Sequence, residues 1–211
     1  MAENTDLWQI ERDLTEQGIG IICGCDEAGA GPLAGPVYAA AVILPPYCQI
    51  EGLNDSKKLT EKKREALYEV ITQKAVCWAV ARMEAAEIDA TDILSARMKA
   101  MQQAMDALTI QPEIALIDGN RDKGRSAAIT TPHKLVVGGD GKSASIAAAS
   151  ILAKVSRDRF VAGELDERYP QYQFAKHKGY ATKLHYEMLD KFGPCPEHRR
   201  SFLKKWEEKR I

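Results

Sequence analysis

Short hydrophobic runs alternate with longer helical stripes along the chain. Residues 19–25 (IGIICGC) form a β-branched run bounded by glycine, which predicts a buried strand. Residues 37–44 (VYAAAVIL) predict its hairpin partner, with Pro36 at the strand entry, where a missing N–H does little harm. Three further strands are predicted, at residues 76–83, 114–117 and 135–137.

Helical periodicity fills the segments around these strands. Residues 7–18 carry apolar side chains at helical spacing and predict a short amphipathic brace. Thr60 is expected to cap a second helix, and a long helix is expected from Asp92 until Pro112 closes it. Residues 143–160 (SASIAAASILAKVSRDRF) predict a helix whose small side chains pack closely on the sheet. The long helix has one apolar stripe that we expect in the core: Leu94, Met98, Met101, Met105 and Leu108.

The order of elements is a three-strand meander, a crossover helix, a strand, a second connection and a last strand. Such an order predicts an α/β fold with a mixed five-stranded sheet flanked by helices.

Acidic residues follow three of the predicted strands. Asp26 and Glu27 end the first strand, Asp118 ends the fourth, and Asp140 follows the fifth. The first two alone fit a solvated strand end equally well, but convergence of all the acids on one rim favours a site. Adjacent strand residues point to opposite faces, so we expect Asp26 to contribute its side chain. Glu27 is expected to contribute through its backbone or from the outer side.

Carboxylates gathered on one rim need a counter-charge. Two of them about 4 Å apart repel by roughly 4 kcal/mol at an effective dielectric near 20. A divalent cation removes the repulsion, and oxygen ligands without His or Cys favour Mg²⁺ or Mn²⁺ over Zn²⁺. A two-ion centre of this kind suits hydrolysis of a phosphodiester, in which one ion generates the hydroxide and the other stabilises the leaving oxygen.

Two glycine-rich segments imitate phosphate-binding motifs. Residues 29–34 fit the dinucleotide fingerprint G-x-G-x-x-A, but a strand-like run follows where that motif opens a helix. Residues 138–143 (GGDGKS) resemble the end of a P-loop, but Val136 stands where the first glycine is required. The turn at 29–31 is either a tight hairpin turn or a place where the backbone approaches a ribose 2′-hydroxyl.

Composition limits the remaining possibilities. The 211 residues include 29 basic and 30 acidic side chains, so affinity for nucleic acid must come from a local patch. No apolar run approaches the roughly 20 residues of a membrane-spanning helix, and the polar N-terminus is unlike a signal peptide. Five cysteines without metal-finger spacing favour a reducing, cytoplasmic setting. No stripe typical of an interface stands out, and we expect a monomer.

Six sequence blocks occur in order between residues 19 and 202: CDEAGAGPLAGPVYAAAVIL, NDSKKLTEKKRE, LIDGN, GGDGKSASIAAASILAKVSRDR, YPQYQFAKHKGYATKLH and HRRSF. In these blocks the chain resembles bacterial ribonuclease HII. The resemblance implies a ribonuclease H-like fold with a C-terminal helical extension. We therefore expect an N-terminal brace at 1–18, a catalytic domain at 19–165 and a helical substrate-binding part at 166–211.

The same resemblance implies an activity. Members of the family hydrolyse the RNA strand of RNA–DNA hybrids and nick 5′ of ribonucleotides embedded in duplex DNA, leaving 3′-hydroxyl and 5′-phosphate ends. The resemblance places the catalytic, metal-binding quartet on Asp26, Glu27, Asp118 and Asp140, the set that the strand pattern selects. The cofactor is then Mg²⁺ or Mn²⁺, two ions per site with substrate bound.

Substrate contacts follow from the resemblance too. The turn Gly29–Ala30–Gly31 is implied to contact the ribose hydroxyl, and Tyr180 to stack on the sugar beside the cleaved junction. The family usually has arginine where this chain has Ala30. We expect cleavage to persist but preference for a single embedded ribonucleotide to change, since phosphate contacts mainly set affinity and register. Candidates for contacts to backbone phosphates are Ser56, Lys57, Lys142, Lys178, Arg199 and Arg200.

Two alternatives stay open from the sequence. One is a ribonuclease HIII-like nuclease with weak activity on single ribonucleotides, which the altered turn makes worth testing. The other is a non-catalytic RNA–DNA hybrid-binding protein, although the presence of all four acids favours an enzyme.

Overall fold

The computed structural model describes residues 6–54 and 56–208. Its sheet has the strand order β3-β2-β1-β4-β5. The central strand β1 (Ile22–Ala28) pairs antiparallel with β2 (Val37–Ile43) and parallel with β4 (Ile114–Asp118). The edge strands are β3 (Cys77–Met83), antiparallel to β2, and β5 (His133–Val136), parallel to β4. The predicted mixed sheet is confirmed.

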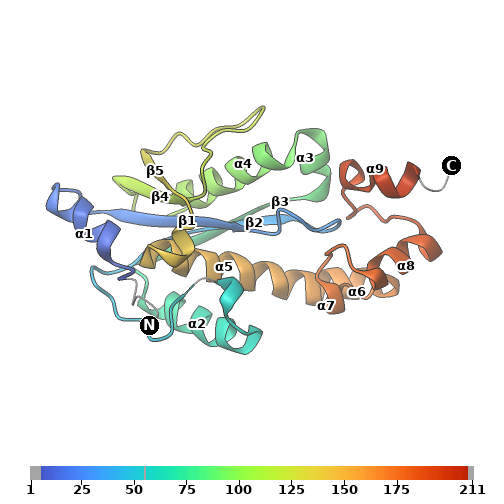
Figure 1. The fold of residues 1–211 in the computed structure, drawn as a ribbon, viewed down its shortest axis with the longest axis horizontal. Coiled ribbons are helices and arrows are strands. Elements are labelled where there is room, and N and C mark those ends of the chain that lie inside the picture. The colour runs from blue at the N-terminus through green and yellow to red at the C-terminus, as the bar shows by residue number, and fades with distance from the viewer. Residues whose placement is uncertain (1–5, 55, 209–211) are drawn as a thin grey trace.

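Helices cover both faces of the sheet (Figure 1). On one face lies α4 (Ile93–Asp106), whose buried methionines form the predicted stripe, with α3 (Ala85–Ala90) beside it. On the other face lie α5 (Ala144–Phe160) and α2 (Glu61–Lys74), and Thr60 caps α2 as predicted. The other described helices are α1 (Gln9–Glu16), α6 (Asp166–Arg168), α7 (Phe174–His177), α8 (Lys183–Phe192) and α9 (Arg200–Glu208). Shorter turns of helix lie at Ser56–Lys58, Gly139–Gly141, Val161–Leu165 and Pro170–Tyr172.

Two of the predicted boundaries were wrong, and one helix was not predicted. Strand β1 does not end at Cys25 but continues to Ala28, because β2 remains paired with it there, so Asp26 and Glu27 lie within the strand. Helix α4 ends at Asp106, well before Pro112, because the chain turns there and buries Leu108. Helix α3 was not predicted, since six residues are too few to show a helical period.

The α5 helix lies unusually close to the sheet. A Cβ atom at Gly24 of β1 would clash with the backbone of Ser145, in the first turn of α5. The helix surface is made of small buried residues, as its sequence predicted. At the same end, Glu11 of α1 accepts hydrogen bonds from the Ser143 hydroxyl at 2.6 Å and the Ser145 N–H at 3.1 Å. The N-terminal helix thus contacts the main body at the start of α5.

A chain of buried histidines joins the C-terminal helices. The Cys195 N–H donates to His198 Nδ1 at 3.0 Å, so His198 carries its proton on Nε2 and donates to His185 Nε2 at 3.0 Å. The Nδ1–H of His185 in turn donates to the Tyr180 carbonyl at 2.9 Å. His177 stacks on His185, with ring centroids 4.3 Å apart. This network fixes the histidines in the neutral state.

Candidate active site

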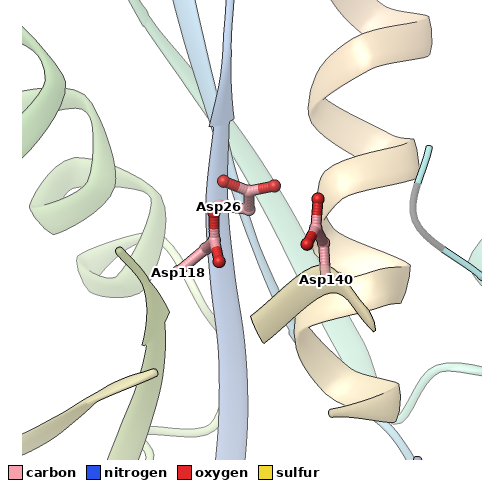
Figure 2. Close-up of side chains that lie close together, drawn as sticks. All are labelled: Asp26, Asp118 and Asp140. Carbon is pink, nitrogen blue, oxygen red and sulfur yellow. The ribbon is translucent and has the colours of Figure 1, made fainter. Parts of the chain in front are cut away.

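Three aspartates from separate elements meet on the face of the sheet that α5 covers. Asp26 comes from the middle of the sheet on β1, Asp118 from the end of β4, and Asp140 from the turn that precedes α5 (Figure 2). One carboxylate oxygen of each lies within 4.8 Å of one oxygen of both others. Asp26 and Asp140 are buried and Asp118 is half-buried. The predicted convergence of these acids is therefore present.

The chain itself compensates these charges only in part. The Gly139 N–H donates to Asp118 Oδ1 at 2.6 Å, and the Glu27 N–H donates to Asp26 Oδ1 at 2.7 Å. Lys57 approaches Asp140 with 3.2 Å between Nζ and Oδ2, but its side chain is 77% exposed and does not fill the space between the acids. Carboxylates at this separation repel by about 3 kcal/mol per pair at an effective dielectric near 20.

Burial adds to this electrostatic imbalance. It raises the pKa of Asp26 well above its ordinary value, and the neighbouring Glu27 and Asp118 carboxylates raise that pKa further. The candidate ligand atoms of this group are carboxylate oxygens, which suit a hard divalent cation such as Mg²⁺ or Mn²⁺. The residues present therefore fit a divalent-metal centre.

Glu27 is separated from the other three acids by the strand alternation. Its side chain points to the opposite face of the sheet, where Oε1 pairs with Arg97 Nη2 of α4 at 2.6 Å. Its other oxygen, Oε2, is buried and has no hydrogen-bond partner in the described part of the chain. The structure thus brings Asp26, Asp118 and Asp140 together and leaves the Glu27 carboxylate outside the group.

The glycine turn after β1 rests on a buried arginine. Gly29 has a φ of +91°, and its carbonyl and that of Ala30 both accept hydrogen bonds from Arg199. Arg199 was predicted to contact phosphate. This prediction was wrong, because the side chain is fully buried and donates its hydrogen bonds to backbone carbonyls. Gly31 is exposed, and a Cβ atom there would meet nothing within 4 Å, so packing within the chain does not require a glycine.

The other predicted contact residues lie on the surface or beside the site. The Tyr180 ring is 40% exposed and lies 5.4 Å from Lys154 Nζ. Lys178 is half-buried with a φ of +51°, and Lys142 is exposed, with Nζ donating to the Val137 carbonyl at 2.7 Å. Two more candidates differ in burial: Ser56 is buried beside Lys57, whereas Arg200 is exposed and reaches Glu207 at 3.5 Å.

The family model described as "Ribonuclease HII" matches residues 23–207 of this sequence. The chain belongs to the ribonuclease HII family. It is accordingly a metal-dependent endonuclease that acts on RNA–DNA hybrids. The ribonuclease HIII-like and non-catalytic alternatives are not favoured.

Individual relatives agree with this assignment. The chain is 57% identical to ribonuclease HII of Idiomarina loihiensis over 182 residues, which are 86% of this chain and 95% of that protein. It is 48% identical to ribonuclease HII of Caldicellulosiruptor bescii over 204 residues, 97% of both chains. Among solved structures, ribonuclease H2 from Pyrococcus horikoshii OT3 superposes with a TM-score of 0.72 at 25% identity, covering 90% of this chain and 98% of the other. The ribonuclease H-like fold that the resemblance implied is thus confirmed.

Two arginines near the site, Arg97 and Arg157, were not predicted from the sequence, and the burial of Arg199 was not predicted either. Arg97 lies between Leu94 and Met101 on the apolar stripe of α4, and a charge at that position is a sign that it faces something other than solvent. Arg157 and Arg199 are both fully buried, and nothing in their local sequence separates them from exposed neighbours.

Among the residues that the structure describes, no helix has the length and apolar composition needed to cross a bilayer.

Proposed function

We propose that this ribonuclease HII cuts phosphodiester bonds with two divalent ions, Mg²⁺ or Mn²⁺, held by Asp26, Asp118 and Asp140. The observation that carries the proposal is the meeting of three carboxylates within 4.8 Å on one face of the sheet. When bound, the ions supply activation of the attacking water and neutralise charge on the leaving oxygen. The expected products end in a 3′-hydroxyl and a 5′-phosphate.

The chain's own groups keep these ligands in place. The N–H of Gly139 fixes one oxygen of Asp118 and the N–H of Glu27 fixes one oxygen of Asp26, so the other oxygen of each carboxylate is oriented before an ion binds. Glu27 contributes to the same centre through its backbone or from the outer side. Its unpartnered Oε2 is consistent with a role that the free protein leaves unused.

The substrate that we propose includes both continuous hybrids and duplex DNA with one ribonucleotide. The exposed Gly31 leaves open space in which a ribose hydroxyl can approach the backbone of the Gly29–Gly31 turn. The exposed Tyr180 ring is available to stack on a sugar. Phosphate contacts are proposed for Ser56, Lys57, Lys142, Lys178 and Arg200.

The proposal is tested with a labelled hybrid and the Asp118→Asn variant. The wild type should cut in Mg²⁺ or Mn²⁺ but not in EDTA, and Asp118→Asn should bind the hybrid without cutting it. Binding without cleavage by the wild type in either metal would favour a non-catalytic protein. Substrate choice is tested on a panel of a continuous hybrid, a duplex with one ribonucleotide and an RNA–DNA junction.

Ala30 is expected to affect substrate preference. A side chain without charge removes one phosphate contact at the turn but keeps both flanking glycines. The Ala30→Arg variant should therefore change the ratio of cleavage rates on the single-ribonucleotide duplex and the long hybrid. An unchanged rate and ratio on both substrates would show that this position does not influence selection.

The proposed setting is the cytoplasm, and the proposed active form is a monomer. All five thiols are free, as suits a reducing compartment. The acids, the glycine turn and Tyr180 all come from one chain, so the site is complete without a second copy.

A further inference from the structure

Two buried arginines lie beneath the glycine turn, although one comes from α5 and the other precedes α9. The side chains of Arg157 and Arg199 are both fully buried. In the described part of the chain no carboxylate pairs with Arg199, and Arg157 reaches only Asp158, at 3.9 Å. Buried charges without carboxylate partners are costly, so what these guanidinium groups bind instead indicates what they are for.

Their partners are backbone carbonyls, all but one of them in residues 29–36, the segment that joins β1 to β2. Arg199 donates from Nε and Nη2 to the Gly35 carbonyl, at 3.0 and 2.8 Å. It also donates from Nη1 to the Ala30 carbonyl at 3.0 Å and from Nη2 to the Gly29 carbonyl at 2.7 Å. One planar guanidinium therefore connects the Gly29–Gly31 turn to Gly35, just before β2.

Arg157 fastens the segment between β1 and β2 to the segment that carries Tyr180. It donates from Nε to the Pro36 carbonyl at 3.1 Å and from Nη2 to the Ala34 carbonyl at 3.3 Å. Its third bond, from Nη1, goes to the Lys178 carbonyl at 3.0 Å. The Tyr180 ring lies 5.6 Å from the Arg157 guanidinium carbon. Arg157 thus joins residues 34–36, which follow the turn, to the segment that carries Tyr180, and its side chain packs against Gly29 of the turn.

Two glycines make this close approach possible. A Cβ atom at Gly29 would clash with the Arg157 side chain, and one at Gly179 would clash with the Ala34 carbonyl oxygen. Both glycines have positive φ, +91° and +80°, which side-chain-bearing residues rarely adopt. Glycine at these two positions therefore accommodates the Arg157 side chain and the close approach of residue 179 to Ala34.

The direction of the carbonyls decides what the turn presents to solvent. All described peptide bonds are trans, so a carbonyl that points inward leaves the N–H of the next residue pointing outward. The carbonyls of Gly29 and Ala30 point at Arg199, so the N–H groups of Ala30 and Gly31 face away from it. Neither N–H donates a hydrogen bond to another described residue.

We propose that Arg157 and Arg199 are positioning residues for substrate discrimination. They hold the Gly29–Gly31 turn with two N–H donors outward and keep it at a fixed distance from Tyr180. The inference rests on the proposed function, in that the turn and the tyrosine meet the sugar of a ribonucleotide. Precise placement matters most for a duplex with one ribonucleotide, which has a single productive register, whereas a continuous hybrid offers a hydroxyl at every position.

Substitution by lysine separates geometry from charge. Arg157→Lys and Arg199→Lys keep the positive charge but cannot span several carbonyls, because an ammonium group lacks the planar fork of donors. The matched control is Arg159→Lys, on the same helix as Arg157, where the exposed arginine pairs with Glu65 and Glu69. Each variant is assayed for kcat and KM on a single-ribonucleotide duplex and on a continuous hybrid, with thermal unfolding as the measure of folding.

The expected loss for Arg199→Lys is about 100-fold in kcat on the single-ribonucleotide duplex and about tenfold or less on the hybrid. Arg157→Lys should show the same selectivity, and Arg159→Lys should leave both rates unchanged. Equal losses on the two substrates, or no loss on either, would overturn the inference while leaving the proposed function intact. Failure of the wild type to cut the single-ribonucleotide duplex would overturn the proposed function, and this inference with it.

A second measurement needs no variant. Amide hydrogen exchange of the wild type in Ca²⁺ should show that the Ala30 and Gly31 N–H groups exchange quickly in the free enzyme. They should become protected on binding the single-ribonucleotide duplex but not on binding an all-DNA duplex of the same sequence. Protection in the free enzyme, or equal protection by both duplexes, would contradict the outward orientation or its role.

Discussion

The three aspartates and the pair Arg157 and Arg199 are two clusters of like charge in the protein interior. Their charges are compensated in different ways. Asp26, Asp118 and Asp140 each have a carboxylate oxygen within 4.8 Å of the others; they accept hydrogen bonds from the Glu27 N–H, the Gly139 N–H and Lys57. Arg157 and Arg199 make seven hydrogen bonds to backbone carbonyls instead. The arginine charges are stabilised by backbone carbonyl dipoles of the chain, whereas we propose that the aspartate charges are compensated by divalent cations. The comparison indicates a structural role for the arginine pair and supports the proposed ligand-binding role of the three aspartates.

The largest expected effect comes from neutralising an acid. Asp26→Asn should lower cleavage of the hybrid on the order of a thousandfold, since an amide is a poor ligand for the cations that carry the chemistry. Without metal the same change should leave the melting temperature unchanged or raise it, because it removes a buried charge from a repelling group. A clear drop in the metal-free melting temperature would show that the acids stabilise the fold after all.

The opposite result is expected for the arginines. Arg199→Met should lower the free energy of unfolding by about 4 kcal/mol, because buried carbonyls of Gly29, Ala30 and Gly35 lose their donors. Denaturant unfolding measures the change. The control Arg168→Met removes an exposed arginine paired with Glu197 and should cost less than about 1 kcal/mol. Similar losses for both variants would mean that the buried hydrogen bonds contribute little.

The buried histidines differ from both charged clusters, because burial lowers their pKa and keeps them neutral. Burial lowers the pKa of His185 from 6.5 to about 4, and an added proton on Nε2 would face the donor of His198. Stability from this group is therefore complete above pH 6.5 and is lost as the pH falls from 6.5 toward 4.

Between pH 7 and pH 5 this amounts to about 2 kcal/mol of unfolding free energy for a histidine with such a shift. The pH dependence of unfolding should shrink by that amount in His185→Asn. The control His133→Asn replaces a partly buried histidine on β5, outside the C-terminal histidine chain. This variant should keep the wild-type pH dependence of unfolding. A His185→Asn variant with an unchanged pH profile would show that His185 is protonated in the native state.

These clusters also differ in how far the sequence predicts them. The acids follow apolar runs, and that pattern predicted that Asp26, Glu27, Asp118 and Asp140 converge; the structure brings three of these side chains together, without that of Glu27. Strand alternation likewise separated Glu27 from Asp26. The burial of Arg199 has no such pattern: its neighbour Arg200 is exposed, and the two differ only because Arg199 reaches carbonyls about 165 positions earlier in the chain. Contacts of that range depend on the assembled fold, and local periodicity does not encode them.

Gly24 shows how the spacing of the proposed metal ligands depends on a residue that is not one of them. Because this glycine lets the first turn of α5 rest directly on β1, the loop that carries Asp140 is drawn in over Asp26. A methyl group added at Gly24 would push the first turn of α5 away from β1 and increase the distance between the carboxylates of Asp26 and Asp140. If the three aspartates bind the ions as proposed, the missing side chain at Gly24 contributes to ion affinity by setting their separation.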